Sequence, residues 1–277
     1  MNFFWIKNRI SHLVVNKPAF FFSESQYALY IQFIGKLFNQ KFKIKRLNLD
    51  LDSLESQIYV ISNRSEKIYI TSGHRTSRFI KGFKNASDRS WRRYGIPELV
   101  NQDGIQTVID IGANIGEFSY AAKVHGALQV FAFEPDPIAF YCLQKNINAF
   151  KEIHLFQTAI SNENKIQNFY ISSKSADSSL LKPTNIESTI EIETKLLDDY
   201  IDIFPKQVDL LKIEAEGFEP EILTGSVKLL KRVKHVSIDA GPERFGEVTV
   251  QEVSKILTEQ NFCIKIFNET IVHGTRK

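Results

Sequence analysis

The chain has 277 residues, of which 43% are apolar, so it is long enough to bury the core of one large α/β domain with an extension. Its formal charge of +3 is small for this length and gives no reason to expect a general polyanion-binding protein. Cys142 and Cys263 lack the spacing of a zinc site and the density of a disulfide framework, which favours a reducing compartment. Charged residues interrupt the apolar N-terminal run. The sequence therefore predicts a cytoplasmic protein with neither a signal peptide nor a membrane-spanning helix.

Two helices are predicted at the start of the chain. Apolar residues recur at helical spacing within 3–14 and 27–38, and Ser23 with Gln26 resembles a capping box before the second helix. The first helix would carry an apolar face and a basic face, a pattern compatible with peripheral membrane contact through residues 1–40. Docking onto the domain, or a dimer contact, explains the same pattern.

After a basic stretch at 41–46, the chain is predicted to form a β-hairpin. Strand-like runs at 58–61 and 67–71 flank a polar turn at 62–66. The hairpin and the two helices together form an accessory region that we place at residues 1–85.

From Thr107 onward, short apolar β-type runs alternate with amphipathic segments, the pattern of a parallel sheet covered by helices. The sequence therefore predicts an α/β fold, a Rossmann-like domain with a mostly parallel central sheet, over residues 86–277. The predicted strands are 107–111, 128–133, 153–158, 208–213 and 235–238, a terminal pair at 262–267 and 270–273, and two added strands at 166–172 and 190–195.

The first of these strands contains Asp110 and runs into a glycine-rich turn. Gly112 and Gly116 permit a sharp strand-to-helix turn, and the first N–H groups of the following helix can bind an anion. Glu134 ends the next strand, where a doubly wound fold places an acid that accepts both hydroxyls of a ribose. Strand, turn, helix, strand and terminal acid together predict a nucleotide-type cofactor.

Asn114, at the centre of this turn, distinguishes between two cofactors. A nicotinamide dehydrogenase normally needs glycine there so that the backbone can approach a pyrophosphate. The Asn114 side chain would crowd a pyrophosphate but could hydrogen-bond an amino acid moiety. We therefore expect S-adenosyl-L-methionine, with its carboxylate at the helix N-terminus. An NAD-dependent oxidoreductase and a non-catalytic module that binds a cofactor or nucleotide stay open as alternatives.

Four ordered segments resemble the FkbM-type methyltransferase family over roughly residues 89–267. They are VIDIGANIGE (108–117), FAFEPDP (131–137), LLDD (196–199) and LKIEAEGFE (211–219). The resemblance implies a class I S-adenosylmethionine-dependent methyltransferase that acts on a hydroxyl oxygen, often of a sugar or another small metabolite. It also implies these cofactor-binding residues: Asp110, Gly112, Asn114, Gly116, Glu134 and Pro135, with Ala159 and Ile160 lining the adenine.

Methyl transfer from a sulfonium chiefly requires that the acceptor be oriented and its proton removed, and the base should stand beyond the carboxyl end of a central strand. Glu214 and Asp239 follow the fourth and fifth strands and are the candidate catalytic residues; desolvation could raise their pKa. Where the resembling family usually has aspartate, this chain has the longer Glu214, which could instead cap the next helix turn. Glu216 is expected to hold the turn at Gly217, and His235 to pack within a strand.

The segment before the catalytic domain is rich in basic and aromatic residues. Between positions 75 and 93, seven Lys and Arg accompany a single acid. Arg89, Arg92, Arg93 and Tyr94 are candidate substrate residues, because guanidinium groups and aromatic rings suit an anionic small-molecule or glycan acceptor. A solvated helix face explains the same charges, and the short patch argues against nucleic acid. No cluster of His, Asp and Glu has ligand spacing, so no metal is expected.

Overall fold

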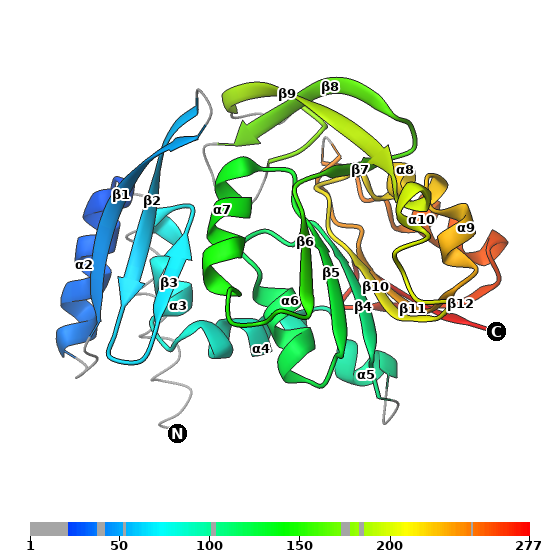
Figure 1. The fold of residues 1–277 in the computed structure, drawn as a ribbon, viewed down its shortest axis with the longest axis horizontal. Coiled ribbons are helices and arrows are strands. Elements are labelled where there is room, and N and C mark those ends of the chain that lie inside the picture. Colours follow the sequence, from blue (N-terminus) through cyan, green and yellow to red (C-terminus); the bar gives the residue numbers. More distant parts are fainter. Residues whose placement is uncertain are drawn as a thin grey trace. The chain divides into compact units, whose positions relative to one another are not determined.

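The computed structural model of the protein describes residues 22–37, 42–51, 54–100, 104–172, 178–182, 186–244 and 246–277. The chain divides into two units, Met1–Ala86 and Ser87–Lys277, and each is described by itself (Figure 1). The helix predicted within 3–14 lies outside the described residues. Within the described ranges, no helix is long and apolar enough to cross a membrane.

The N-terminal unit contains the second predicted helix, α2 (Glu24–Leu37). The capping box before it is confirmed, because the N–H of Ser23 donates to Gln26 Oε1 (2.9 Å) and the N–H of Gln26 donates to Ser23 Oγ (3.4 Å). Tyr27 and Ile31 are almost completely buried. The apolar spacing of this helix therefore marks the face that packs inside the unit.

Three antiparallel strands form the sheet of this unit, in the order β1 (Lys43–Leu51), β2 (Leu54–Ser62) and β3 (Lys67–Ile70). The predicted hairpin is confirmed as β2 and β3. Strand β1 was not predicted, because its basic residues obscured the strand pattern. Lys43 and Lys45 are exposed on this edge strand, where lysine discourages pairing with other chains.

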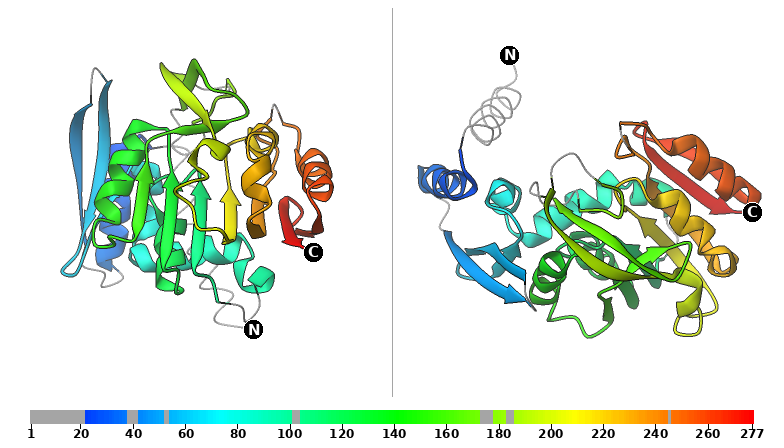
Figure 2. Two further views of the ribbon diagram at one scale, coloured as in Figure 1. Left: turned by 45° about the vertical axis from the view of Figure 1, so that its right-hand side comes forward. Right: turned by 90° about the horizontal axis from the view of Figure 1, so that it is seen from above.

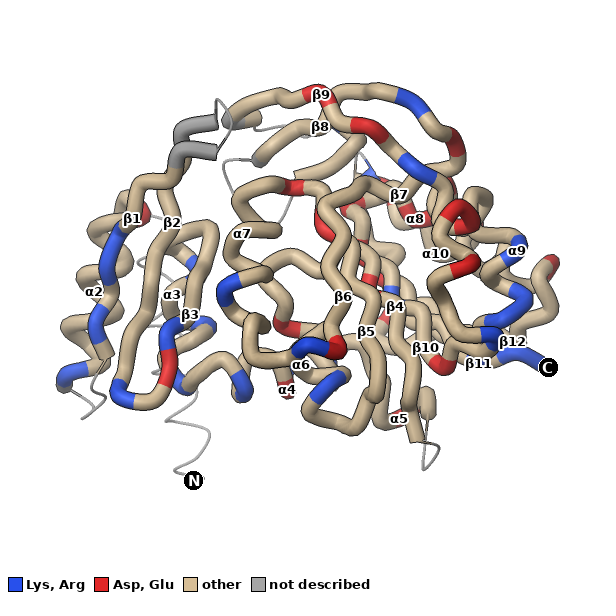
Figure 3. Tube along the Cα trace, in the orientation of Figure 1, with Lys and Arg blue, Asp and Glu red and all other residues tan. Residues whose placement is uncertain are grey.

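Charge is distributed unevenly between the two units. Residues 1–86 carry 14 Lys and Arg against five Asp and Glu, a formal charge of +9, whereas residues 87–277 carry 21 against 27, a formal charge of −6. Figure 3 shows basic residues along β1 and one near the end of α2. The N-terminal unit is therefore strongly basic, which the total charge of the chain does not reveal.

Seven strands form the central sheet of the second unit, in the order β12-β13-β11-β10-β4-β5-β6. The five strands from β11 to β6 are parallel and β13 pairs antiparallel with β11, which confirms the Rossmann-like α/β fold. All seven strands were predicted. Their bounds are β4 (Thr107–Ile111), β5 (Gln129–Phe133), β6 (Ile153–Phe156), β10 (Val208–Ile213), β11 (Val233–Asp239), β12 (Phe262–Phe267) and β13 (Ile271–Arg276).

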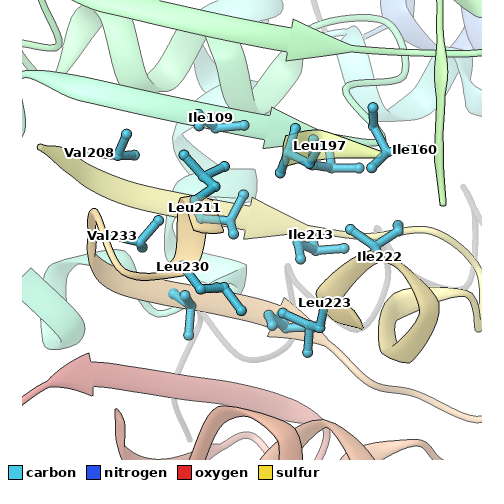
Figure 4. Close-up of a cluster of buried hydrophobic side chains, with 14 of the residues drawn as sticks. Ile109, Ile160, Leu197, Val208, Leu211, Ile213, Ile222, Leu223, Leu230 and Val233 are labelled. Atoms are coloured by element: carbon cyan, nitrogen blue, oxygen red, sulfur yellow. The ribbon is translucent and has the colours of Figure 1, made fainter. Parts of the chain in front are cut away.

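Helices cover both faces of this sheet, because the parallel strands carry apolar residues on each side. On one face, Ile109, Leu211 and Ile213 pack in a cluster with residues of α8, α9 and α10 (Figure 4). On the other face, Val108 and Leu210 pack with residues of α4 to α7. The helices after β3 are η2 (Gly73–Arg75), α3 (Thr76–Phe79), α4 (Phe83–Arg93), α5 (Ile96–Val100), α6 (Glu117–Val124), α7 (Pro137–Asn146), η3 (Leu197–Tyr200), α8 (Glu219–Thr224), α9 (Val227–Leu230) and α10 (Val250–Glu259).

A second sheet in this unit has the strand order β7-β9-β8 and comprises β7 (Ala159–Ser161), β8 (Lys165–Ser172) and β9 (Ile186–Leu196). The two added strands of the sequence prediction are confirmed as β8 and β9. Strand β7 was not predicted, because three residues are too short for a recognisable pattern. Figure 2 shows that this sheet lies at the carboxyl ends of the central parallel strands, where the predicted site residues gather.

Candidate functional site

The turn after β4 has a backbone shape that dictates its residues. Gly112 has φ +71°, and a Cβ there would lie 1.8 Å from the carbonyl oxygen of Glu214, so no side chain fits. Asn114 (φ +49°) and Gly116 (φ +96°) are also left-handed, a conformation that asparagine tolerates better than most residues. Helix α6 begins at Gly116 without a side-chain cap, an arrangement in which a helix N-terminus can bind an anion.

Glu134 is fixed against this turn. Its Oε2 accepts the N–H of Asn114 (2.7 Å) and its Oε1 accepts the N–H of Asp136 (2.9 Å). Burial and the charge of Asp136 raise the pKa of Glu134 to about 8. The acid predicted to bind the ribose thus lies beside the turn predicted to hold the methionine moiety.

A cavity of about 230 Å³ opens beside the carboxyl ends of β5 and β6. Of the residues predicted to line the adenine, Ala159 borders this cavity together with Pro135, whereas Ile160 belongs to the buried cluster that contains α8. The left-handed turn, the uncapped helix start, the buried acid and the cavity fit S-adenosylmethionine. The lining residues are Pro135, Gln157, Thr158 and Ala159, with Ile192, Glu193 and Lys195 of β9.

Asp110 lies inside the protein rather than on the surface of the turn. It is 0% exposed, its Oδ2 accepts the hydroxyl of Ser119 (2.6 Å), and its Oδ1 lies 3.0 Å from Lys212 Nζ. Lys212 Nζ also donates to the carbonyl oxygens of Ile111 (3.2 Å) and Gly112 (2.9 Å). Asp110 and Lys212 therefore brace the turn from within. Lys212 was not predicted as a site residue, although a lysine in a buried strand is a signal for one.

The two candidate catalytic acids lie together at the ends of adjacent strands. Glu214 follows β10 and Asp239 ends β11. One nitrogen of Arg93, Nη2, bridges them at 2.7 Å from Asp239 Oδ2 and 3.2 Å from Glu214 Oε1. Lys212 Nζ lies 3.6 Å from the other oxygen of Glu214. The site thus joins two acids from the sheet with a cation from α4.

Burial also changes the acidity of Asp239. Its side chain is 7% exposed. Burial, followed by the charge of Glu214, raises the pKa of Asp239, while Arg93 opposes this effect. A carboxyl group with a raised pKa is a better proton acceptor than a solvated one.

The structure divides the basic segment into two parts. Arg93 reaches the acid pair, and the buried ring of Tyr94 lies beneath the ammonium of Lys212, 5.1 Å from it. Burial and the charge of Glu214 raise the pKa of Tyr94 well above its usual value. Arg89 and Arg92 are exposed on α4. The four candidate substrate residues therefore do not form one patch.

Glu219 holds the turn after Glu214. Its Oε1 accepts the N–H groups of Ala215 (2.9 Å) and Gly217 (3.1 Å), whereas Glu216 contributes its carbonyl oxygen to the hydroxyl of Ser179 (3.2 Å). Burial raises the pKa of Glu219 to about 7. Glu216, with φ +51°, lies in the same turn, and its predicted structural role there stays a prediction.

A short segment between β8 and β9 contacts both the residues around Glu134 and the turn after Glu214. Ser178 Oγ donates to Asp136 Oδ2 (2.9 Å) beside Glu134, and Ser179 Oγ donates to the carbonyl of Glu216. From another loop, Arg244 Nε donates to the carbonyl of Gly217 (2.9 Å). These contacts tie the loops around the acid pair to the cofactor side. Among the described residues, no group of three or more His, Cys, Asp and Glu could hold a metal ion.

Comparison with known proteins identifies the chemistry of this arrangement. The sequence profile of the Methyltransferase FkbM domain matches residues 110–264, more than half of the chain. The chain is 25% identical over 201 residues to the 2-O-methyltransferase NoeI of Sinorhizobium fredii, covering 66% of this chain and 82% of that protein. It is 27% identical over 163 residues to the methyltransferase sdnD of Sordaria araneosa, covering 46% of this chain and 63% of that protein.

Solved structures with a similar fold include two bacterial methyltransferases. One is the N-methyltransferase NodS of Bradyrhizobium japonicum, with a TM-score of 0.43 and 13% identity, covering 70% of this chain and 98% of that chain. Another is the precorrin-6y C5,15-methyltransferase of Geobacter metallireducens, with a TM-score of 0.41 and 13% identity, covering 67% of this chain and 89% of that chain.

Proposed function

Because the chain belongs to the FkbM methyltransferase family, whose cofactor is S-adenosylmethionine, we propose that it methylates a hydroxyl oxygen of a sugar or related small metabolite. The name of the relative NoeI, a 2-O-methyltransferase, supports an oxygen acceptor. The resemblance of the four sequence motifs supports a carbohydrate or similar metabolite.

The observation that carries this proposal is the pair of acids bridged by Arg93. Glu214 and Asp239 stand at the carboxyl ends of adjacent strands, the edge at which α/β folds place their reacting groups. Arg93 lies within 3.2 Å of both carboxylates, so the two acids act as one unit. A hydroxyl group that binds there can donate to either carboxylate and lose its proton to it.

Charge balance supports the same assignment. Two cations and three carboxylates give this cluster a formal charge of −1: Arg93, Lys212, Asp110, Glu214 and Asp239. S-adenosylmethionine, when bound, supplies a methyl group on a positively charged sulfonium. The hydroxyl proton of the acceptor would pass to Glu214 or Asp239 when the oxygen takes up this methyl group. The negative charge of the cluster complements the positive charge of the sulfonium.

The proposed cofactor contacts follow from the same geometry. The N–H groups at the start of α6 and the left-handed turn at Asn114 would hold the methionine moiety, and Glu134 would accept hydrogen bonds from the ribose. Pro135 and Ala159 would contact the adenine in the cavity. Asp110 would act through Lys212 and the turn rather than by direct contact, because its carboxylate is buried.

The acceptor class can be tested with methyl-labelled S-adenosylmethionine and a panel of sugars, sugar phosphates and their deoxy analogues. We expect a methyl ether on a sugar hydroxyl and no product from the analogue that lacks this hydroxyl. A methyl group found on nitrogen or carbon would contradict the proposal. If the acceptor is anionic, Arg89→Ala and Arg92→Ala should reduce kcat/KM for the sugar phosphate and leave that for the neutral sugar unchanged.

We also propose that the N-terminal unit makes peripheral contact with an anionic lipid bilayer. Helix α2 exposes Leu29 (66%) and Phe33 (59%), with Lys36 on the same side of the helix, and the unit carries a formal charge of +9. Exposed apolar side chains beside basic residues favour an anionic membrane surface. The double variant Leu29→Ser, Phe33→Ser should lose flotation with phosphatidylserine liposomes, while Ile166→Ser on β8 should not. Equal flotation of both variants would contradict this contact.

A further inference from the structure

Lys212 is a charged side chain in the middle of a buried strand. It is 1% exposed, and its ammonium is surrounded by the rings of Tyr94 (5.1 Å) and Phe118 (5.7 Å). An ammonium group in such a place is costly unless it is paired and hydrogen-bonded. The polar contacts of Lys212 therefore stabilise its charged side chain in the interior, and their arrangement indicates its role.

These contacts join the two halves of the site. On the cofactor side, Lys212 Nζ donates to the carbonyl oxygens of Ile111 and Gly112 and pairs with Asp110, which Ser119 of α6 also holds. On the acceptor side, the same nitrogen lies 3.6 Å from Glu214 Oε2. A backbone hydrogen bond also joins the two sides, because the N–H of Glu214 donates to the carbonyl of Ile111 (3.1 Å).

We propose that Lys212 is a positioning residue that couples the cofactor-binding turn to Glu214, holding this carboxylate ionised and oriented so that it can receive the acceptor proton. The proposal rests on the function proposed above and concerns a residue that makes no contact with the acceptor itself. Its partner Asp110 keeps Lys212 charged and aims it at the turn. A change at the turn is therefore transmitted to the acid through this ammonium group as well as through the backbone.

The expected direction of the effect follows from the charges around Glu214. An opposite charge within about 4–6 Å lowers the pKa of a carboxyl group by about 1–3 units, so loss of the ammonium should raise the pKa of Glu214. Other charged and polar groups near Glu214 also act on its pKa, some raising it and some lowering it. They are Arg93 at the end of α4 and Tyr94 directly after it, Asp110 from β4, Asp239 at the end of β11, and Glu243 from the loop that follows.

The test compares Asp110→Asn with the double variant Asp110→Asn, Lys212→Met. The double variant is used because Lys212→Met alone would leave Asp110 buried without its partner and could fail to fold. Lys123→Met on α6, which loses an ion pair with Glu152 and hydrogen bonds to the carbonyl oxygens of Ala127 and Leu128 but lies outside the site, serves as the control. The pKa of Glu214 is measured without cofactor from the carboxyl ¹³C resonance that Glu214→Gln removes, and the pH profile of kcat is measured with the acceptor.

We expect the pKa of Glu214 and the acidic limb of kcat to move to higher pH by at least about one unit in the double variant. Asp110→Asn alone should move both in the opposite direction or leave them unchanged, and Lys123→Met should match the wild type. A folded double variant with the wild-type Glu214 pKa and the wild-type pH profile would overturn the proposal. If Glu214→Gln itself left kcat unchanged, the proposed role of Glu214 as proton acceptor would fail instead, so the two failures are distinguishable.

Discussion

Replacing Gly112 by alanine would place a Cβ 1.8 Å from the carbonyl oxygen of Glu214. Real Cβ atoms keep at least 3.0 Å, so one backbone must move by about 1.2 Å, the difference between the two distances. The strands resist this movement, because Ile111 pairs with Ile213 and accepts the N–H of Glu214. The clash therefore lies between the proposed cofactor-binding turn and Glu214, a proposed proton acceptor.

The cost of Gly112→Ala can be estimated from its parts. The left-handed conformation costs about 1–2 kcal/mol for a residue with a Cβ. Overpacking adds about 1–3 kcal/mol, and the weakened hydrogen bond to Ile111 about 1 kcal/mol. A total of about 3–6 kcal/mol corresponds to a fall in Tm of about 6–24 °C for a domain of this size. A displacement of about 1 Å at the site should also lower kcat about 100-fold.

Gly126→Ala is the matched control. Gly126 has φ +108°, also outside the usual range for other residues, but nothing lies within 4 Å of a Cβ built there. Differential scanning calorimetry and titration with S-adenosylhomocysteine should show a small loss of Tm and unchanged affinity for Gly126→Ala. The same measurements should show a large loss of Tm and of affinity for S-adenosylhomocysteine in Gly112→Ala. If the two variants behaved alike, the close approach of Gly112 to Glu214 would not be the reason for glycine.

Two further predictions concern buried acids. The pKa of Glu134 is about 8, and only its ionised form is a pure acceptor for the ribose hydroxyls, so affinity for S-adenosylhomocysteine should rise as the pH rises to about 8. In Glu134→Gln the affinity should be lower and independent of pH, as calorimetry from pH 6 to 9 can show. The pKa of Glu219 is about 7 in the folded protein against 4.5 for the free group, so the free energy of unfolding should fall as the pH rises from 4.5 to 7. This shift of 2.5 units corresponds to about 3 kcal/mol, measurable by urea denaturation, and Glu219→Gln should abolish it.

The outcomes that would contradict these two predictions differ. A wild-type affinity for S-adenosylhomocysteine that stayed constant from pH 6 to 9 would mean that Glu134 is ionised throughout. For Glu219, the sign is decisive: a raised pKa means that the folded protein holds the proton more tightly, so stability must be lost with rising pH. Equal pH dependence in the wild type and in Glu219→Gln would assign the effect to another group.

The sequence predicted the central sheet well because its strands are short apolar runs with clear ends. Strand β4, for example, is apolar except for Thr107 and Asp110 and stops at the obligatory turn of Gly112. Strand β1 was missed because Lys43 and Lys45 interrupt its pattern, and β7 because it has three residues. Local patterns reveal an element only when it is long enough and when solvent-facing residues do not dominate it.

The cofactor turn and both acids could be placed from sequence because each follows directly from the end of a strand. The contacts between these groups could not be predicted, because the residues that form each contact are far apart along the chain. Arg93 and Asp239 are separated by 146 positions, and Lys212 and Gly112 by 100. Only the strand order, which sets β10 between β4 and β11, brings these groups together.

The most direct test of the central claim is the rate of methyl transfer in a single turnover by the wild type, Glu214→Gln and Asp239→Asn, together with their affinity for S-adenosylhomocysteine. Both substitutions preserve size and remove the negative charge that can accept a proton and that pairs with Arg93. If the acid pair receives the acceptor proton, the rate should fall about 10²–10⁴-fold in the more important variant, while affinity for S-adenosylhomocysteine stays near the wild-type value. Wild-type rates in both variants would contradict the assignment of Glu214 and Asp239.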